Sequence, residues 1–244
     1  MKKVLALVAA AGILSVASFA SAATIVGSKH DMNAAYAGGV IGGAGAAAAS
    51  GTTQVCVYCH APHVSQMAMP LWNRNNPSGF TLYSGLNMAN VSFKSGFTAD
   101  STSLFCMSCH DGNMNINAVY NQGANVRNSG ASLVTGTITG TYTNLGKNLS
   151  NTHPVNFPVL NNSQADLNYV ASNTYMGPIA AQAVTAGAPN ITTTFPLFKA
   201  TRSGVTTNQS LECGSCHSVH DFTISPFLRA TMNKSALCLG CHNK

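Results

Sequence analysis

All eight cysteines of the 244-residue chain lie in pairs with the spacing C-x-x-C, and a histidine directly follows each pair. In c-type cytochromes, C-x-x-C-H is the motif that attaches haem. Two thiols form thioethers with one haem, and the adjacent histidine becomes the proximal ligand of the iron. The pattern predicts four covalently bound haem c groups. The predicted attachment residues are Cys56, Cys59, Cys106, Cys109, Cys213, Cys216, Cys238 and Cys241.

Other chemistries of paired cysteines explain less of this pattern. Four pairs could form two zinc sites of four thiolates each, but the histidine after each pair would then have no role. A redox-active cysteine pair would account for one copy of the motif. A disulfide framework in an exported protein needs no histidine after every second cysteine. The use of every cysteine in the same motif therefore favours haem.

The number of histidines matches the number of axial ligands that four six-coordinate haems need. The predicted proximal ligands are His60, His110, His217 and His242. The other four histidines, predicted to be distal ligands, are His30, His63, His153 and His220. Methionine is the rival distal ligand, and the chain has nine, but core packing is the ordinary role of methionine.

Two of the predicted distal histidines follow a proximal histidine by three residues, as His63 follows His60 and His220 follows His217. On a helical turn, residues with this spacing lie side by side, about 5–6 Å apart at Cβ. They cannot easily hold opposite faces of one haem. We therefore expect His63 and His220 each to bind a neighbouring haem, which brings two haems close together for fast electron transfer.

The composition indicates that large side chains do not fill the interior. Only 7% of residues are charged and 7% are aromatic, against about 25% charged residues in an average soluble domain. Lysine and arginine do not cluster beyond Lys2 and Lys3, which argues against a nucleic-acid-binding protein. We expect mostly irregular coil with short α-helices and little β structure, built around a chain of stacked haems.

The N-terminal residues 1–22 have the pattern of a Sec signal peptide. Lys2 and Lys3 precede an apolar stretch over 4–19, and the small residues 20–22 form an A-x-A cleavage site. A transmembrane anchor is the alternative, but the apolar stretch is short for a span of about 20 residues. The protein is therefore expected to be exported, to the cell surface or exterior, with the periplasm as the alternative.

The predicted mature tetrahaem domain, 23–244, has three parts. Residues 23–120 carry the first two motifs, and 210–244 carry the last two. Between them, 121–209 is an insert rich in threonine, asparagine and serine, in which His153 is the one predicted ligand.

Three stretches carry local structural signals. Residues 34–51 are almost entirely alanine and glycine, which suits either an interrupted helix or a connector. Alternation over 132–139 predicts a short strand pair or an extended loop. Between the third and fourth motifs, a proline at the start of 226–235 predicts a short helix.

These motifs resemble the doubled C-x-x-C-H class of multihaem cytochromes c. The resemblance rests on residues 28–32, 55–63, 71–74 and 152–155. With four motifs, a signal peptide and little charge, the chain is most similar to OmcE-type tetrahaem subunits of extracellular cytochrome nanowires. That resemblance implies bis-histidine haems stacked through a polymer of identical subunits, with one distal ligand donated by the adjacent subunit. His30 is the candidate donor, although it could equally fold back onto its own chain.

The expected function is electron transfer without substrate turnover, because bis-histidine ligation leaves no open position on the iron. The expected partners are identical subunits in a filament, periplasmic or outer-membrane cytochromes as donors, and extracellular acceptors such as metal oxides. The first alternative is a soluble periplasmic tetrahaem shuttle with the same ligands. The second is a multihaem reductase, which would require one haem with an open axial position.

Overall fold

The computed structural model describes residues 25–26, 28–32, 55–63, 71–83, 96–122, 133, 135–158, 178–179, 195–202 and 205–239. The predicted signal peptide, the alanine- and glycine-rich stretch 34–51, Cys241 and His242 lie outside these residues. In the described part of the chain, none of the helices has the length and apolar character needed to cross a membrane.

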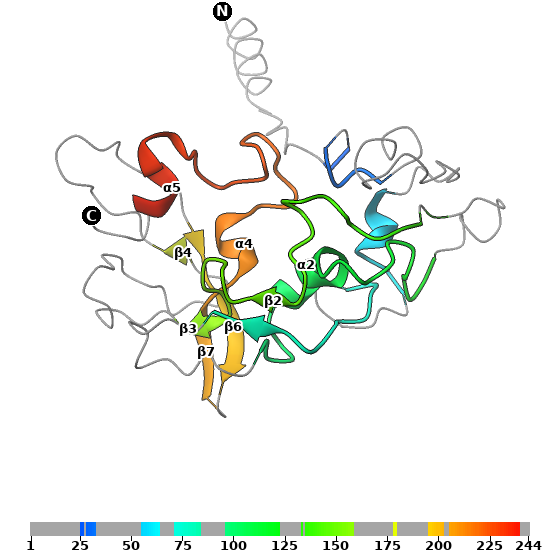
Figure 1. Cartoon of the computed structure of the whole chain (residues 1–244), viewed down its shortest axis with the longest axis horizontal. Helices are drawn as coiled ribbons and strands as arrows, with labels where there is room; N and C mark the ends of the chain where they lie inside the picture. The colour runs from blue at the N-terminus through cyan, green and yellow to red at the C-terminus, as the bar shows by residue number, and fades with distance from the viewer. Residues whose placement is uncertain are drawn as a thin grey trace, which may run out of the picture.

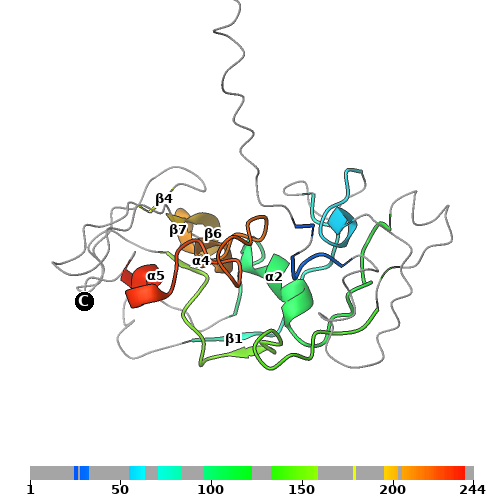
Figure 2. The same cartoon turned by 90° about the horizontal axis from the view of Figure 1, so that it is seen from above.

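The helices are short, and most of them overlap a haem motif. They are η2 (Val55–Tyr58), α2 (Ser103–His110), α4 (Cys213–Cys216), η4 (Asn233–Ser235) and α5 (Ala236–Leu239). A helical turn brings residues i and i+3 to the same side, so the turns at the first three motifs each present both cysteines of the motif together. Figures 1 and 2 show η2 and α5 toward opposite ends of the long axis, with α2 and α4 between them.

The strands are also short, and they form three small sheets. They are β1 (Thr81–Leu82), β2 (Asn148–Leu149), β3 (Phe157–Pro158), β4 (Pro178–Ile179), β5 (Phe195–Pro196), β6 (Phe198–Arg202) and β7 (Val205–Leu211). β1 and β2 are parallel. β3, β7 and β6 form an antiparallel sheet in that order, and β4 pairs with β5. β7 leads almost directly into α4, so this sheet positions the third motif.

Among the described residues, the buried apolar side chains form two small hydrophobic clusters. The first contains Met32, Val57, Tyr58, Ile116, Leu133 and Ile138, with Cys59, Cys109 and Val119 packed against it. The second contains Phe80, Leu82, Leu104, Met107 and Leu149, with Phe97 packed against it. The first cluster lies between the first two haem motifs, which it holds together.

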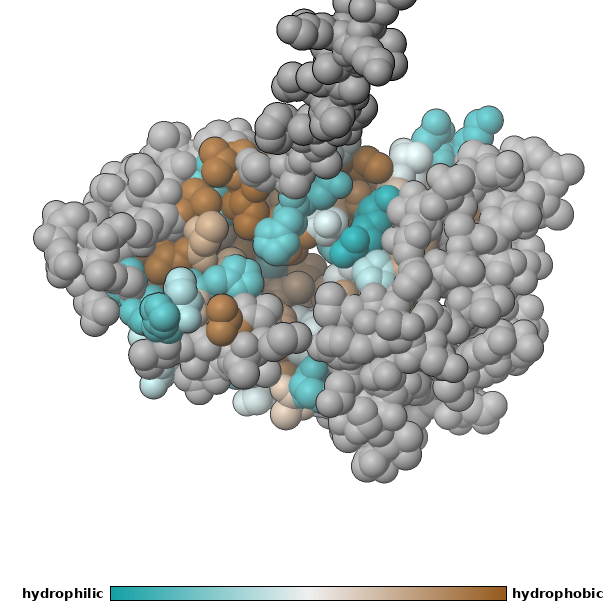
Figure 3. Space-filling view, turned by 180° about the vertical axis from the view of Figure 1, so that it is seen from behind, coloured by the Kyte–Doolittle hydropathy of each residue, from teal (hydrophilic) through white to brown (hydrophobic). Residues whose placement is uncertain are grey.

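The described residues are mostly coil with few short helices and little strand, which confirms this part of the sequence-based expectation. Apolar side chains also remain at the surface, where Val26, Tyr120 and Met232 are each more than half exposed. Figure 3 shows apolar and polar side chains next to one another on the back face.

The predicted helix over 226–235 is wrong. Its first part is an irregular turn whose backbone bonds mainly to the third motif and to the residue after it. The Ser218 amide donates to the Phe227 carbonyl at 2.7 Å, and the Arg229 amide donates to the Cys216 carbonyl at 2.9 Å. Helical structure begins only with η4 and α5.

Within 132–139, the described residues belong to none of the strands, so the strand pair that is one of the two structures predicted there is not seen in them. The Gly136 carbonyl in this segment accepts a hydrogen bond from the Ile116 amide at 2.8 Å.

Candidate haem sites

The segment 71–74 holds the first motif in place. The Asn73 amide donates to the Cys59 carbonyl at 2.9 Å, and its side-chain Nδ2 donates to the Val57 carbonyl at 2.6 Å. The ring of Trp72 lies edge-on to the His60 imidazole, with centroids 6.0 Å apart. The backbone and the proximal histidine of this motif are therefore both in contact with one short segment.

Arg74 extends this contact to the second motif. Its guanidinium donates to the carbonyls of Ile116 at 2.6 Å, Asn115 at 2.7 Å and Ser108 at 2.9 Å. Ser108 lies inside the second C-x-x-C run, between Cys106 and Cys109. One fully buried side chain thus fixes the second motif relative to the first.

The second and third motifs also touch. Glu212, which is buried, accepts hydrogen bonds from the hydroxyls of Ser101 and Ser210, each at 2.6 Å, and from Ser103. The Cys213 amide donates to the Ser103 hydroxyl at 3.0 Å. In addition, the Cys106 thiol hydrogen-bonds the Cys213 thiol. The first cysteines of the two motifs are therefore neighbours.

The protein environment opposes thiolate formation at several attachment cysteines. Desolvation raises the pKa of Cys59 to about 12 and that of Cys216 to about 11. It also raises the pKa of Cys109. The thiolate is the form that binds zinc or attacks a disulfide, whereas a thioether is uncharged. These sites therefore fit covalently attached haem better than a charged thiolate.

Two pairs of histidine rings have the spacing that a shared iron requires. The ring centroids of His30 and His110 are 6.1 Å apart, and those of His60 and His220 are 6.2 Å apart. A metal–imidazole nitrogen bond of about 2 Å places two rings on opposite sides of one ion at a centroid separation of about 6 Å. Each pair joins a predicted proximal ligand to a predicted distal ligand, so the residues fit haem.

Backbone carbonyls orient two of the predicted proximal histidines. The Nδ1 atom of His110 is 2.7 Å from the Thr143 carbonyl oxygen, and the Nδ1 atom of His217 is 3.0 Å from that of Pro226. Histidine ligands typically donate one ring N–H in this way, which leaves the other nitrogen for the metal. A contact of this kind through Nδ1 leaves Nε2 of each ring as the nitrogen that could face a metal.

The surroundings of three of the paired histidines, His30, His110 and His220, favour the neutral state. Desolvation, reinforced by nearby His110, lowers the pKa of His30 to about 4. Desolvation also lowers the pKa of His110 and, together with His60, that of His220. A histidine must be neutral to ligate a metal, so these environments prepare the rings for that role.

The structure does not bring every predicted ligand into a histidine pair. His63 and His217 are both exposed, and among the described histidines neither ring contacts another histidine ring. His153 is exposed, with Nδ1 2.9 Å from the Pro154 carbonyl oxygen.

The Cys216 and Cys238 thiols interact electrostatically, so the third and fourth motifs are also close.

The sequence-based prediction gave no role to Arg74, Asn73 or Glu212, which hold the motifs together. One signal was available for the two charged residues, because ionisable side chains are scarce in this chain. Arg74 lies two residues after Trp72, and Glu212 lies directly before the third motif. Charged residues at such positions are conspicuous in a chain that has so few of them.

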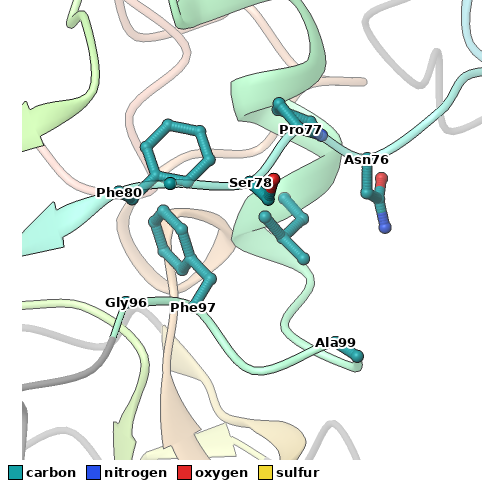
Figure 4. A pocket seen from close by; sticks show the side chains of 9 residues that line it. Asn76, Pro77, Ser78, Phe80, Gly96, Phe97 and Ala99 are labelled. Carbon is teal, nitrogen blue, oxygen red and sulfur yellow. The ribbon is translucent and has the colours of Figure 1, made fainter.

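A pocket of about 410 Å³ lies beside these sites, between 76–80 and 96–99. Figure 4 shows the rings of Phe80 and Phe97 next to each other in its lining, where they pack edge to face with centroids 5.1 Å apart. Its lining contains no cysteine or histidine, so this pocket supplies no iron ligand.

Comparison with known families supports the haem assignment. Residues 205–244 match the family described as Doubled CXXCH motif. The match supports a multihaem c-type cytochrome. It covers the third and fourth motifs and supports covalent haem c and a role in electron transfer. No curated protein matches the chain.

Proposed function

We propose that the protein is an exported tetrahaem c-type cytochrome that conducts electrons through closely spaced bis-histidine haems. The observation that carries this proposal is the pair of histidine–histidine distances, 6.1 and 6.2 Å, each joining a C-x-x-C-H motif to a histidine outside it. When bound, haem would supply a one-electron redox centre at each motif.

The contacts between motifs support short electron-transfer distances. Cys59 and Cys109 pack against the same hydrophobic cluster, which joins the first and second motifs. Cys106 contacts Cys213, and Cys216 lies near Cys238. In this proposal the four haems are therefore neighbours in the order of their motifs along the chain.

Removal of a distal ligand tests the ligand pairs. His30→Ala and His220→Ala should each leave four haems attached but convert one of the four from low-spin to high-spin. Haem content is measured by the pyridine haemochrome assay, and spin state by electron paramagnetic resonance. An unchanged spectrum in either variant would show that the corresponding pair does not ligate iron.

Binding of carbon monoxide distinguishes electron transfer from the reductase alternative. A fully six-coordinate native protein should not bind carbon monoxide after reduction, whereas His30→Ala should bind about one molecule per chain. Stoichiometric binding by the native protein would instead indicate an open haem site and favour a reductase.

We further propose that the protein polymerises into an extracellular filament, as the resemblance to OmcE-type subunits implies. It would receive electrons from periplasmic or outer-membrane cytochromes and deliver them to acceptors such as metal oxides. The low charge of the chain supports this, since only 7% of residues are charged and weakly charged surfaces favour association.

The structure favours a different donor for the inter-subunit ligand than the sequence suggested. His30 is 6.1 Å from His110 of its own chain and stacks on Phe227 at 4.4 Å, which favours ligation within the chain. His63 is exposed, as is His217. We therefore propose that His63 of one subunit ligates the haem of motif 213–217 in the next, which gives a head-to-tail polymer.

Electron microscopy of the haem-loaded native protein tests this arrangement. We expect filaments from the native protein and from His30→Ala, but discrete particles with four haems from His63→Ala. Intact His63→Ala filaments would rule out His63 as the donor. Discrete particles from the native protein would favour the soluble periplasmic shuttle.

A further inference from the structure

Arg74 is a buried cation whose hydrogen-bond partners are all neutral. Its side chain is 0% exposed, and its guanidinium donates to the carbonyls of Ser108, Asn115 and Ile116. The guanidinium of arginine carries a positive charge that is delocalised over its planar group. Carbonyl dipoles stabilise this charge without cancelling it.

This charge lies between the first and second haem motifs. Arg74 directly follows Asn73, whose amide donates to Cys59 of the first motif at 2.9 Å. The Nε and Nη2 atoms of Arg74 both donate to Ser108, inside the second motif, at 3.2 and 2.9 Å. Arg74 is therefore next in sequence to a residue that contacts the first motif, and its guanidinium contacts the second motif directly.

The second motif also has a carboxylate next to it, because Asp111 directly follows His110. Asp111 is buried, and its Oδ1 accepts hydrogen bonds from the amides of Asn113 and Met114 at 2.9 and 2.8 Å. Among the described contacts, Asp111 makes no ion pair with Arg74, so the two charges do not neutralise each other directly.

We propose that Arg74 raises the reduction potentials of the haems attached at 56–60 and 106–110 relative to those attached at 213–217 and 238–242. This inference rests on the proposed function, because it requires haem at these motifs. Reduction removes one positive charge from the iron, so a nearby fixed cation favours the reduced state. In a low-dielectric interior this effect is large and weakly screened by salt.

The third motif has an arginine in a comparable position that provides an internal control. Arg229 donates to the Gly214 carbonyl, inside the third C-x-x-C run, at 2.8 Å. Unlike Arg74, it is only partly buried, and the Asp221 carboxylate acts on it electrostatically. Its effect on the adjacent haem should be smaller and should weaken with salt.

The consequence is an uneven distribution of electrons along the molecule. In a partly reduced protein, electrons reside mainly on the first two haems, toward the end of the molecule opposite α5 (Figure 1). Arg74 is thus a positioning residue. Its positive charge shifts the reduction potentials of the haems, and its side chain does not ligate iron.

Spectroelectrochemical titration of the haem-loaded full-length protein tests the proposal. Arg74→Gln removes the charge and should lower the highest-potential components of the titration, with little dependence on ionic strength. Arg74→Lys keeps the charge and should restore them toward the native values. Arg229→Gln should lower the reduction potential of a different component of the titration, by a smaller amount, and added salt should reduce this shift.

A second variant keeps the Arg74 hydrogen bonds intact. Asn115→Asp retains the oxygen that accepts from the Asn117 and Gly136 amides at 3.2 and 3.0 Å, and it adds a negative charge beside the guanidinium. It should lower the same potentials at low salt. If neither Arg74 variant retains four haems, this variant decides the question.

The outcomes separate this inference from the proposed function. Native protein without four haems would overturn the proposed function. Four haems with unchanged potentials in Arg74→Gln, or in Asn115→Asp at low salt, would overturn only the role of Arg74. If Arg74→Gln and Arg74→Lys lowered the reduction potentials equally, the proposed role of the Arg74 charge would also be overturned. The geometry of the side chain, and not its charge, would then set the potentials.

Discussion

Asn73 joins backbone segments that are far apart in the chain. Its Nδ2 donates to the carbonyls of Val57 and Asn121, both at 2.6 Å, and its Oδ1 accepts from the Asn121 amide at 2.7 Å. The side chain is 0% exposed, so water cannot replace these partners. Buried polar groups that lose a partner bear the full cost of their desolvation.

Asn73→Ala should therefore lower the free energy of unfolding by about 2–3 kcal/mol, because it leaves buried backbone groups unpaired. Thermal denaturation of the haem-loaded protein measures this. The matched control is Asn113→Ala, at an exposed asparagine whose side chain makes one long hydrogen bond of 3.3 Å. Equal losses in the two variants would contradict the role assigned to Asn73.

Glu212 should make stability depend on pH. Desolvation raises its pKa above the usual 4.5, despite the hydroxyls that donate to it. The folded state then binds more protons than the unfolded state, so this group's contribution to the free energy of unfolding falls as pH rises above 4.5. Glu212→Gln should remove this part of the pH dependence, as measured by melting temperature against pH. A profile parallel to that of the native protein would contradict the assignment.

At the residue scale, the sequence predicts the part of the site that is defined by the spacing of residues close together in the chain. The C-x-x-C-H motifs are contiguous, so they can be recognised without a structure. The roles of Arg74 and Glu212 could not be predicted, because they depend on contacts between distant residues. Arg74 and Ser108 are 34 positions apart, and Glu212 and Ser101 are 111 apart.

At the scale of elements, α4 packs tightly against the residues around β5 and β6. A Cβ added at Gly214 would lie 2.8 Å from the Phe198 ring, and Phe198 is itself buried. The glycine therefore allows the third motif to approach this sheet more closely than any other residue would.

Gly214→Ala should destabilise the protein by about 1–3 kcal/mol, the usual cost of overpacking. Phe198→Leu should relieve part of that loss in the double variant, because it removes the atoms that clash. Thermal denaturation of the two single variants and the double variant measures the coupling. Strictly additive losses would show that the two side chains do not compete for space.

The segment 226–235 shows why a local sequence signal for a helix can fail. The proline at 226 is a valid helix-start signal, but the following backbone bonds to 216–218 instead. Tertiary hydrogen bonds outweigh a weak local preference in such a short segment. By contrast, the expectation of a coil-rich chain holds, because it rests on composition over the whole sequence.

At the scale of the whole molecule, the described side chains form two small clusters instead of one core. We therefore expect the chain produced without haem attachment to lack cooperative thermal unfolding and to be digested rapidly by proteases. Circular dichroism and limited proteolysis of the haem-free and haem-loaded forms measure the difference. A cooperative transition in the haem-free chain would show that these clusters suffice for folding.

The contact between Cys106 and Cys213 constrains how the protein can be made. In an oxidising compartment, two neighbouring thiols can form a disulfide, and a disulfide between these two would block two attachment sites at once. We therefore expect haem attachment at one of these motifs to come before the folding step that brings the two cysteines together.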